Sequence, residues 1–329
     1  MRNKSQLVQA FLRAEESGQC LLADDRNAQV SLHRRLQTGE VLTPFPRIYA
    51  RASYWSRLSY SEKGWHILRS LALLHPNWTF CAASAAWVWG ITESYALLEP
   101  ICVATMCESH VCTSERVRRV LIRKGLDDHY TLRSGIRVTV PERTIFDCAR
   151  FLAFHDALAI CDAALRKQLC DVDEMAEYLR GMARHRCWKK ALRVWLHADG
   201  RAENGGESMA RARIIELGFA TPDLQVPFED PVSHREYRVD FLWTREDGHR
   251  IIGEFDGLQK YVDPTLSRGR SVEQILRDER RRESRLSIKD VSIMRFDYSE
   301  LRDSIRFARL LTQFGVPRAA STHAQPGKL

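Results

Sequence analysis

The chain has 329 residues, 44% of them hydrophobic and 28% charged, with a formal net charge of +8 at pH 7. This length accommodates two or three domains, and no run approaches the ~20 apolar residues of a membrane-spanning helix. Nine cysteines without a paired framework fit a reducing compartment, and the charged amphipathic start is unlike a signal peptide, so we expect a cytoplasmic protein without membrane contact.

Residues 1–53 predict a small DNA-binding unit. Helical spacing over 5–15 is followed by a short apolar piece, a second helix over 28–37 and a proline-containing hairpin over 41–51. This order is typical of a winged helix-turn-helix. The second helix presents His33, Arg34 and Arg35, which we interpret as contacts to DNA. The alternative is a small helical cap whose arginines face water.

Residues 54–200 predict a mostly helical domain with a small sheet. The expected strands span 98–104, 117–124 and 135–140, and the expected helices span 62–74, 80–91, 141–153, 155–167, 171–180 and 184–198. Arg143 and Asp147 are spaced to pair across one helical turn. We interpret that pair as a device that positions the helix, with catalysis as the less favoured alternative.

Three stretches of this front part resemble abortive-infection (AbiEi-like) antitoxins. Residues 39–49 are similar to the Gly-x-Leu-x-x-x-Pro-x-x-Tyr run that ends the wing in that family, and residues 80–91 resemble its Ser-Ala-Ala helix. Arg143, Thr144 and Asp147 resemble its Arg-Thr-x-x-Asp. The resemblance implies a DNA-binding protein with a cognate toxin as a partner.

A polar, glycine-rich linker over 198–206 separates a third domain, residues 201–314, from the middle one. Strands are predicted over 236–243 and 250–256, joined by a turn that contains Asp247 and Gly248. If the strands pair, Asp240, Glu254 and Asp256 converge on one face, an arrangement that a bound cation would stabilise. The alternative is a hairpin whose acids face water. Residues 315–329 are expected to be a disordered tail.

The same residues resemble restriction-endonuclease-like nucleases of the PD-(D/E)xK superfamily, and the branch similar to very-short-patch-repair endonucleases in particular. The resemblance implies that Asp240 and Glu254 hold Mg²⁺, that Glu207 or Asp256 completes the metal shell, and that Lys260 stabilises charge on the phosphate. Two positions depart from the pattern. Asp256 stands where the wider superfamily has its lysine, and Lys260 stands where this branch has histidine.

The sequence therefore predicts an α/β, more specifically α+β, multidomain protein. It consists of an N-terminal winged helix-turn-helix, a helical middle region with a small sheet, and a restriction-endonuclease-like mixed sheet flanked by helices. The expected function is DNA binding combined with Mg²⁺-dependent endonuclease activity in a defence or toxin–antitoxin context. The alternative is a transcriptional regulator or antitoxin whose nuclease fold is inactive and grips DNA or protein.

Overall fold

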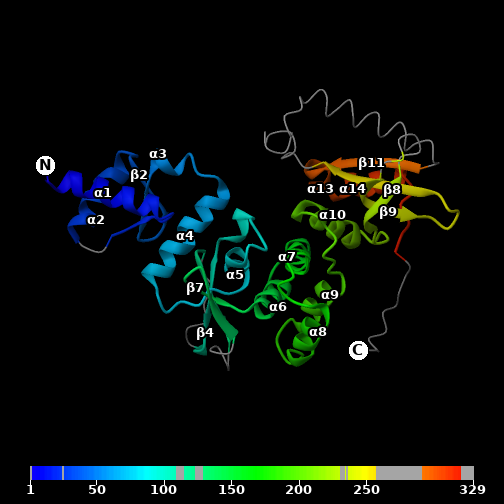
Figure 1. Cartoon of the computed structure of the whole chain (residues 1–329), viewed down its shortest axis with the longest axis horizontal. Coiled ribbons are helices and arrows are strands. Elements are labelled where there is room, and N and C mark those ends of the chain that lie inside the picture. The colour runs from blue at the N-terminus through cyan, green and yellow to red at the C-terminus, as the bar shows by residue number, and fades with distance from the viewer. Residues whose placement is uncertain are drawn as a thin grey trace. The chain divides into compact units, whose positions relative to one another are not determined.

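The chain forms two compact units in the computed structural model (Figure 1). The structure describes residues 2–23, 26–108, 115–122, 129–229, 234, 236–256 and 291–319. Unit 1 consists of residues 1–151 and 172–191, and unit 2 of residues 152–171 and 192–329. No helix among the described residues is both long enough and apolar enough to cross a membrane.

The N-terminal part of unit 1 is a small helix-and-sheet assembly. Its elements are α1 (Arg2–Glu16), β1 (Leu21–Leu22), α2 (Arg26–Gln37), β2 (Val41–Phe45) and β3 (Ile48–Arg51). The three strands pair in the order β1-β3-β2, and buried Phe11, Leu32 and Val41 form the core between helices and sheet. The order of elements agrees with the sequence interpretation, whereas the winged helix-turn-helix itself stays a prediction.

The rest of unit 1 is mainly helical, as expected. Its elements are α3 (Ala52–Trp55), α4 (Tyr60–Leu74), α5 (Ala82–Trp89), η1 (Tyr95–Leu97), β4 (Ile101–Thr105), β5 (Val117–Leu121), β6 (Tyr130–Arg133), β7 (Ile136–Thr139), α6 (Pro141–Phe151) and α8 (Val172–Gly181). Helix α9 (Trp188–Leu196) begins in unit 1 and ends in unit 2. Strand β6 was not predicted from the sequence. It pairs with β7 through the Ser134-Gly135 turn, in which both residues have a positive φ.

The backbone of Thr79–Cys81 joins the two halves of the small sheet in unit 1. The Phe80 amide donates to the carbonyl of Arg137 on β7 (2.8 Å), and the Cys81 amide donates to the carbonyl of Cys102 on β4 (3.0 Å). Helix α5 begins immediately afterwards and packs against α6. Strands β4 and β5 pair in parallel. These hydrogen bonds join the β4–β5 and β6–β7 pairs.

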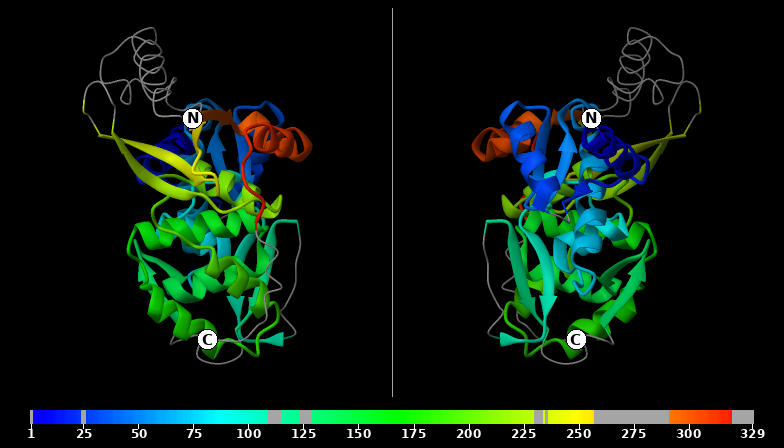
Figure 2. Two further views of the ribbon diagram at one scale, coloured as in Figure 1. Left: turned by 90° about the vertical axis from the view of Figure 1, so that its right-hand side faces the viewer. Right: turned by 90° about the vertical axis from the view of Figure 1, so that its left-hand side faces the viewer.

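Unit 2 is a four-stranded mixed sheet with helices. Its elements are α7 (Phe154–Arg166), α10 (Gly205–Glu216), β8 (Asp223–Glu229), β9 (Glu236–Thr244), β10 (Arg250–Asp256), β11 (Val291–Asp297), α13 (Tyr298–Arg302) and α14 (Ser304–Gln313). The strand order is β11-β10-β9-β8. Strands β8, β9 and β10 run antiparallel side by side (Figure 2), and β11 runs parallel to β10. The expected pairing of 236–243 with 250–256 is therefore confirmed.

Helices cover one face of this sheet through an aromatic core. Phe241, Phe255 and Phe296 come from three adjacent strands and pack with residues of α10, α13 and α14. Helix α7 also belongs to unit 2, because buried Asp162 on α7 forms an ion pair with buried Arg211 on α10 (2.7 Å). The glycine-rich linker suggested a domain boundary at residue 201, whereas unit 2 also includes residues 152–171 and 192–200.

Side chains do not alternate regularly along β8 and β9. The sequence pattern places Val239 on the face of Phe241, but Val239 packs with Phe228 and Leu242 in a separate cluster on the other face. This expectation was wrong, because Val239 and Leu242 pack in the same cluster although regular alternation puts them on opposite faces. The pairing of β8 with β9 is interrupted at the same place, between Leu224/Phe241 and Val226/Val239, where Gln225 has a left-handed backbone (φ 52°).

The segment expected to be a disordered tail begins as ordered chain. Val316 is buried, the Ala220 amide donates to the Pro317 carbonyl (2.8 Å), and the Ala319 amide donates to the Gly218 carbonyl (3.0 Å). The expectation was therefore wrong for residues 316–319, because Val316 contributes to the aromatic core of unit 2. Residues 320–329 lie outside the described part of the chain.

Candidate functional site

One amide brings together two acidic side chains of unit 2, buried Glu207 and half-buried Asp240. The Nε2 group of Gln225 donates to Oε2 of Glu207 (3.1 Å) and to Oδ1 of Asp240 (3.3 Å). The three residues come from α10, β8 and β9. The left-handed φ of Gln225 is a strained conformation for a residue with a Cβ atom, and such residues concentrate at functional sites.

Glu207 is held at the start of α10 by local hydrogen bonds. Its backbone amide donates to Oδ1 of Asn204, the residue that caps the helix, and its carboxylate accepts from the Glu203 amide (2.8 Å) and from Nδ2 of Asn204 (2.5 Å). Glu207 is only 3% exposed. Burial and the neighbouring charge of Asp240 raise the pKa of Glu207 to about 7. This carboxyl is therefore poised to exchange a proton near neutral pH.

Gly206 allows α10 to approach the sheet closely enough for this arrangement. A Cβ atom at this position would overlap the ring of Phe255 and lie 2.9 Å from Oη of Tyr298. The adjacent Gly205 has open space around it. Gly206 is thus required by the close packing of the helix start on β10.

Asp240 is oriented by the neighbouring strand. Its Oδ2 accepts a hydrogen bond from the Phe255 amide (2.9 Å), and the regular pairing of β9 with β10 extends only as far as Phe241 and Gly253. The carboxylate thus takes the place of a backbone acceptor where the ladder ends. This bond fixes the second oxygen of Asp240 independently of Gln225.

The other predicted metal ligands on β10 are arranged differently. Glu254 and Asp256 are both half-buried, and Oδ2 of Asp256 lies 3.7 Å from Nη1 of Arg295, which belongs to the parallel strand β11. Among the described residues, no three His, Cys, Asp or Glu side chains gather closely enough to form a metal site by themselves. The expected convergence of Asp240, Glu254 and Asp256 therefore does not occur in this part of the chain. Lys260 lies outside it.

Sequence reasoning found Glu207 and Asp240 but missed the residues that join them. Asn204 followed three positions later by Glu207 is a recognisable helix-start signal, so that contact was readable from the sequence. The role of Gln225 was not, because nothing in its sequence neighbourhood indicates a left-handed backbone.

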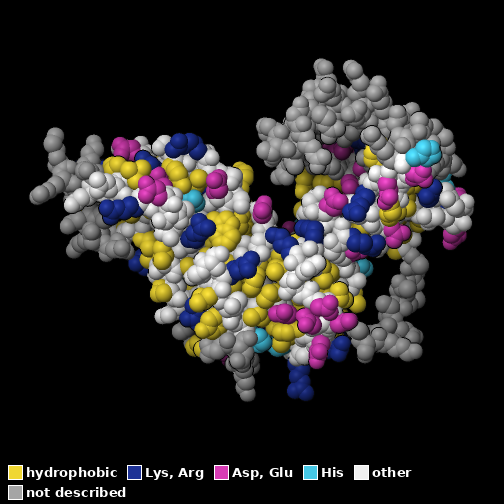
Figure 3. Space-filling view, in the orientation of Figure 1, with side chains coloured by type: hydrophobic (Ala, Val, Ile, Leu, Met, Phe, Trp, Pro, Cys, Tyr) yellow, Lys and Arg dark blue, Asp and Glu magenta, His cyan; other side chains and the backbone are white. Residues whose placement is uncertain are grey.

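The predicted DNA-contacting residues lie on α2 in unit 1. His33 and Arg34 are exposed and Arg35 is half-buried. A hollow of about 560 Å³ between α2 and the β2–β3 hairpin is lined by His33, Arg47 and Tyr49, among others. Exposed Arg47 was not singled out from the sequence. On the face drawn in Figure 3, basic side chains of the N-terminal part are interspersed with acidic ones.

Comparisons with known proteins include a match to one family model. Residues 79–197 match the family model described as the AbiEi antitoxin C-terminal domain. A stretch of 131 residues is 34% identical to the uncharacterized protein Rv2248 of Mycobacterium tuberculosis strain H37Rv and to MT2308 of strain CDC 1551. It covers 40% of this chain and 47% of theirs, so the chain spans about half the length of these curated relatives.

One solved structure also shows a limited similarity. The crystal structure of RV2827C protein from Mycobacterium tuberculosis aligns with a TM-score of 0.34 at 15% identity, over 63% of this chain and 78% of that one. The family match supports the antitoxin-like part of the resemblance noted in the sequence. Residues 79–197 of this chain are thus similar to the C-terminal domain of AbiEi antitoxins.

Proposed function

We propose that the protein is a DNA-associated component of a toxin–antitoxin or defence system, and that unit 2 hydrolyses phosphodiester bonds with the help of Mg²⁺. The observation that carries this proposal is the pair of carboxylates of buried Glu207 and half-buried Asp240, which share one bridging amide from Gln225. The arrangement of α10, three antiparallel strands and a parallel β11 supports the resemblance to restriction-endonuclease-like nucleases.

The donor set fits a small divalent cation. Mg²⁺ prefers carboxylate oxygens, and Glu207 and Asp240 present their oxygens to the same Nε2 group. A rotation of the Gln225 amide would turn its carbonyl oxygen toward the same point, so that all three side chains would act as ligands. Glu254, the other metal ligand that the resemblance implies, does not gather with Glu207 and Asp240 in the described part of the chain.

When bound, Mg²⁺ supplies a Lewis acid that polarises a phosphate and lowers the pKa of a coordinated water. The residues of the chain would bind the ion and hold its carboxylate ligands in place. The Phe255 amide fixes Asp240, and the Asn204 cap fixes Glu207. Lys260 would place a positive charge on the substrate phosphate. Arg295, beside Asp256, is a second candidate for that role.

A cleavage assay with paired variants tests this proposal. Full-length protein should cut duplex or single-stranded DNA, or RNA, only when Mg²⁺ or Mn²⁺ is present. Asp240→Asn removes one negative charge at nearly constant shape and should abolish cleavage. Asp223→Asn makes the same chemical change at an exposed position of β8 and should leave cleavage intact. Equal activity of both variants, or no cleavage of any substrate by wild type, would contradict the proposal.

A regulator without nuclease activity is the second candidate. The position of Asp256, paired with Arg295 where the superfamily has its lysine, favours it, as does the match of residues 79–197 to an antitoxin domain. In this case unit 2 would bind DNA or a toxin without cutting. Metal-independent, salt-sensitive binding to duplex DNA together with failure of the cleavage assay would select this candidate.

A further inference from the structure

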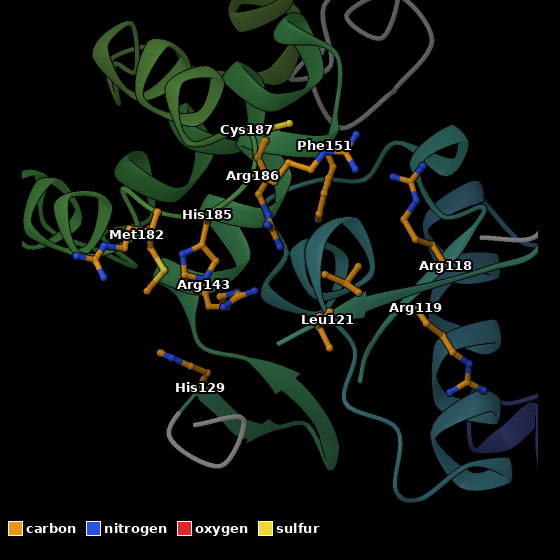
Figure 4. A pocket seen from close by; sticks show the side chains of 13 residues that line it. Arg118, Arg119, Leu121, His129, Arg143, Phe151, Met182, His185, Arg186 and Cys187 are labelled. Carbon is orange, nitrogen blue, oxygen red and sulfur yellow. The ribbon is translucent and has the colours of Figure 1, made fainter. Parts of the chain in front are cut away.

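A large pocket in unit 1 is surrounded by arginine side chains (Figure 4). Its volume is about 1310 Å³, and it lies among β5, α6 and the segment 182–187 that follows α8. Six arginines line it: Arg118, Arg119, Arg143, Arg150, Arg184 and Arg186. All of its lining residues belong to unit 1, and none of them belongs to the carboxylate pair described above.

The positive charge of this pocket is only partly compensated. Asp147 accepts from Nε of Arg143 (3.0 Å) and from Nε of Arg150 (2.9 Å), so one carboxylate serves two guanidinium groups. Within the described part of the chain, the pocket lining includes no Asp or Glu, and Arg118 and Arg186 form no ion pair. The exposed acidic residues of α8, which gather on the surface in Figure 3, do not line the pocket.

One nitrogen of the buried Arg143 guanidinium has no acceptor within the described part of the chain. Its side chain is 2% exposed, and among the described residues neither Nη2 of Arg143 nor the hydroxyl of nearby Tyr178 has a partner in hydrogen-bonding geometry. A buried donor without an acceptor destabilises the protein. Because Arg143 lines the pocket, an anionic oxygen that enters it would supply the missing acceptor.

Arg118 and Arg150 both contact the ring of Phe151. The guanidinium carbon of Arg150 lies 4.2 Å from the ring centre of Phe151, and that of Arg118 lies 5.9 Å from the same ring. Figure 4 shows Arg118 and Phe151 on one side, and His185 next to Arg143 on another. Guanidinium groups held in place lose less entropy when they bind a phosphate, and their planar donors suit two phosphate oxygens at once.

One side of the pocket is lined by side chains that carry no positive charge. Leu121 and Met182 are apolar, and partial burial together with the charges of Arg143 and Arg150 lowers the pKa of His185, which leaves its ring neutral at pH 7. An inorganic anion would make no use of this side, whereas the flat ring of an organic ligand would pack against it. The volume exceeds the roughly 300–1,000 Å³ of ordinary small-molecule sites, so a ligand with several phosphates fits.

We propose that this pocket binds a nucleotide with two or more phosphate groups. The phosphates contact Arg143 at the floor and Arg118 and Arg186 nearer the rim, and the base lies against Leu121, Met182 and His185. A free nucleotide fits better than a nucleic-acid strand because Arg143 is buried. A protruding terminal phosphate reaches it, whereas the phosphates of a continuous backbone are flanked by sugars on both sides.

Calorimetric titration of the full-length protein with ATP tests this inference. Arg118→Gln and Arg186→Gln should each weaken ATP binding about tenfold or more, the loss of one charge-assisted contact. Arg180→Gln, the same change at an exposed position of α8 outside the pocket, should alter it less than twofold. Arg143→Lys retains the charge but loses the planar donor group, and should also weaken binding.

Further ligands distinguish the classes of anion. ATP should bind more tightly than AMP, which has one phosphate, and more tightly than inorganic tripolyphosphate, which has no base. Equal affinity for ATP and tripolyphosphate would overturn the assignment of a nucleotide. Absence of ATP binding at millimolar concentration would overturn it as well. So would a single-stranded oligonucleotide that binds through Arg118 and Arg186 and that ATP does not displace.

Discussion

At the scale of single residues, the environment of Glu207 determines what its carboxyl can do. The side chain is buried beside Asp240, and the hydrogen bonds from the Glu203 amide and from Gln225 offset only part of the cost of its charge. Its pKa is therefore raised from 4.5 to about 7. A carboxyl with a raised pKa stabilises the folded state in its protonated form and destabilises it when ionised.

This shift predicts how stability depends on pH in metal-free protein. The contribution of Glu207 is fully present below pH 4.5, its pKa in the unfolded chain, and is lost as the pH rises through about 7. The loss is on the order of 3 kcal/mol. Glu207→Gln should therefore lose less unfolding free energy than wild type between pH 5 and pH 8. Urea denaturation with a chelator measures this difference.

The control for this experiment is Glu216→Gln, the same change at the other end of α10. It should follow the pH dependence of wild type. If the curves of all three proteins are parallel, Glu207 does not titrate in this range and its environment differs from the one described.

Several residues of the candidate site could be predicted from the sequence, but the residue that joins the two carboxylates could not. The pairing of Arg143 with Asp147 followed from their spacing, and the structure confirms it at 3.0 Å. Glu207 and Asp240 were identified by resemblance. Gln225 was not, because no local turn signal indicates its left-handed φ and its two carboxylate partners lie far from it in the sequence.

At the scale of elements, α10 depends on close contact with the sheet. Gly206 meets Phe255 and Tyr298, whereas Gly205 faces open space. Gly206→Ala should therefore displace the start of α10 and cost about 1–3 kcal/mol of unfolding free energy. Gly205→Ala should be neutral or slightly stabilising, because alanine favours a helix. Chemical denaturation of both variants measures the difference, and equal stability of the two would refute the close packing.

Helix α2 carries the prediction for DNA binding. If Arg34 and Arg35 contact phosphates, replacing each with Gln should reduce the slope of log affinity against log salt by about 0.9 per lost contact. Arg13→Gln, at an exposed position of α1, should leave the slope unchanged. Fluorescence anisotropy with labelled duplex DNA measures this slope. A slope that none of the arginines affects would favour the alternative of a solvated helical cap.

Periodic helices and strands were the easiest elements to predict. Helix α4 follows its apolar spacing and begins at the capping box of Ser59 and Glu62. Strand β6 was missed because it has only four residues, two of them exposed, so it lacks an alternating apolar pattern. The predicted facing of Val239 on β9 was wrong because regular alternation does not hold along this strand, where Val239 and Leu242 pack in the same cluster.

At the scale of the whole molecule, the two units carry different chemistry. The excess of Lys and Arg over Asp and Glu is +3 in residues 1–53, +4 in 54–200 and only +1 in 201–329. The arginine pocket lies in unit 1 and the carboxylate pair in unit 2. The division into units was less predictable than the elements. Helix α7 belongs to unit 2 through the buried ion pair of Asp162 with Arg211, and these two residues lie far apart in the sequence.

The most direct test of the proposed function is calorimetric titration of the full-length protein with Mn²⁺ as a substitute for Mg²⁺, in the absence of nucleic acid. Wild type and Asp223→Asn should bind the ion and gain thermal stability as its concentration rises. Asp240→Asn should bind it at least tenfold more weakly and gain correspondingly less stability. Indistinguishable titrations of Asp240→Asn and Asp223→Asn, or no binding by wild type, would contradict a metal site at Glu207 and Asp240.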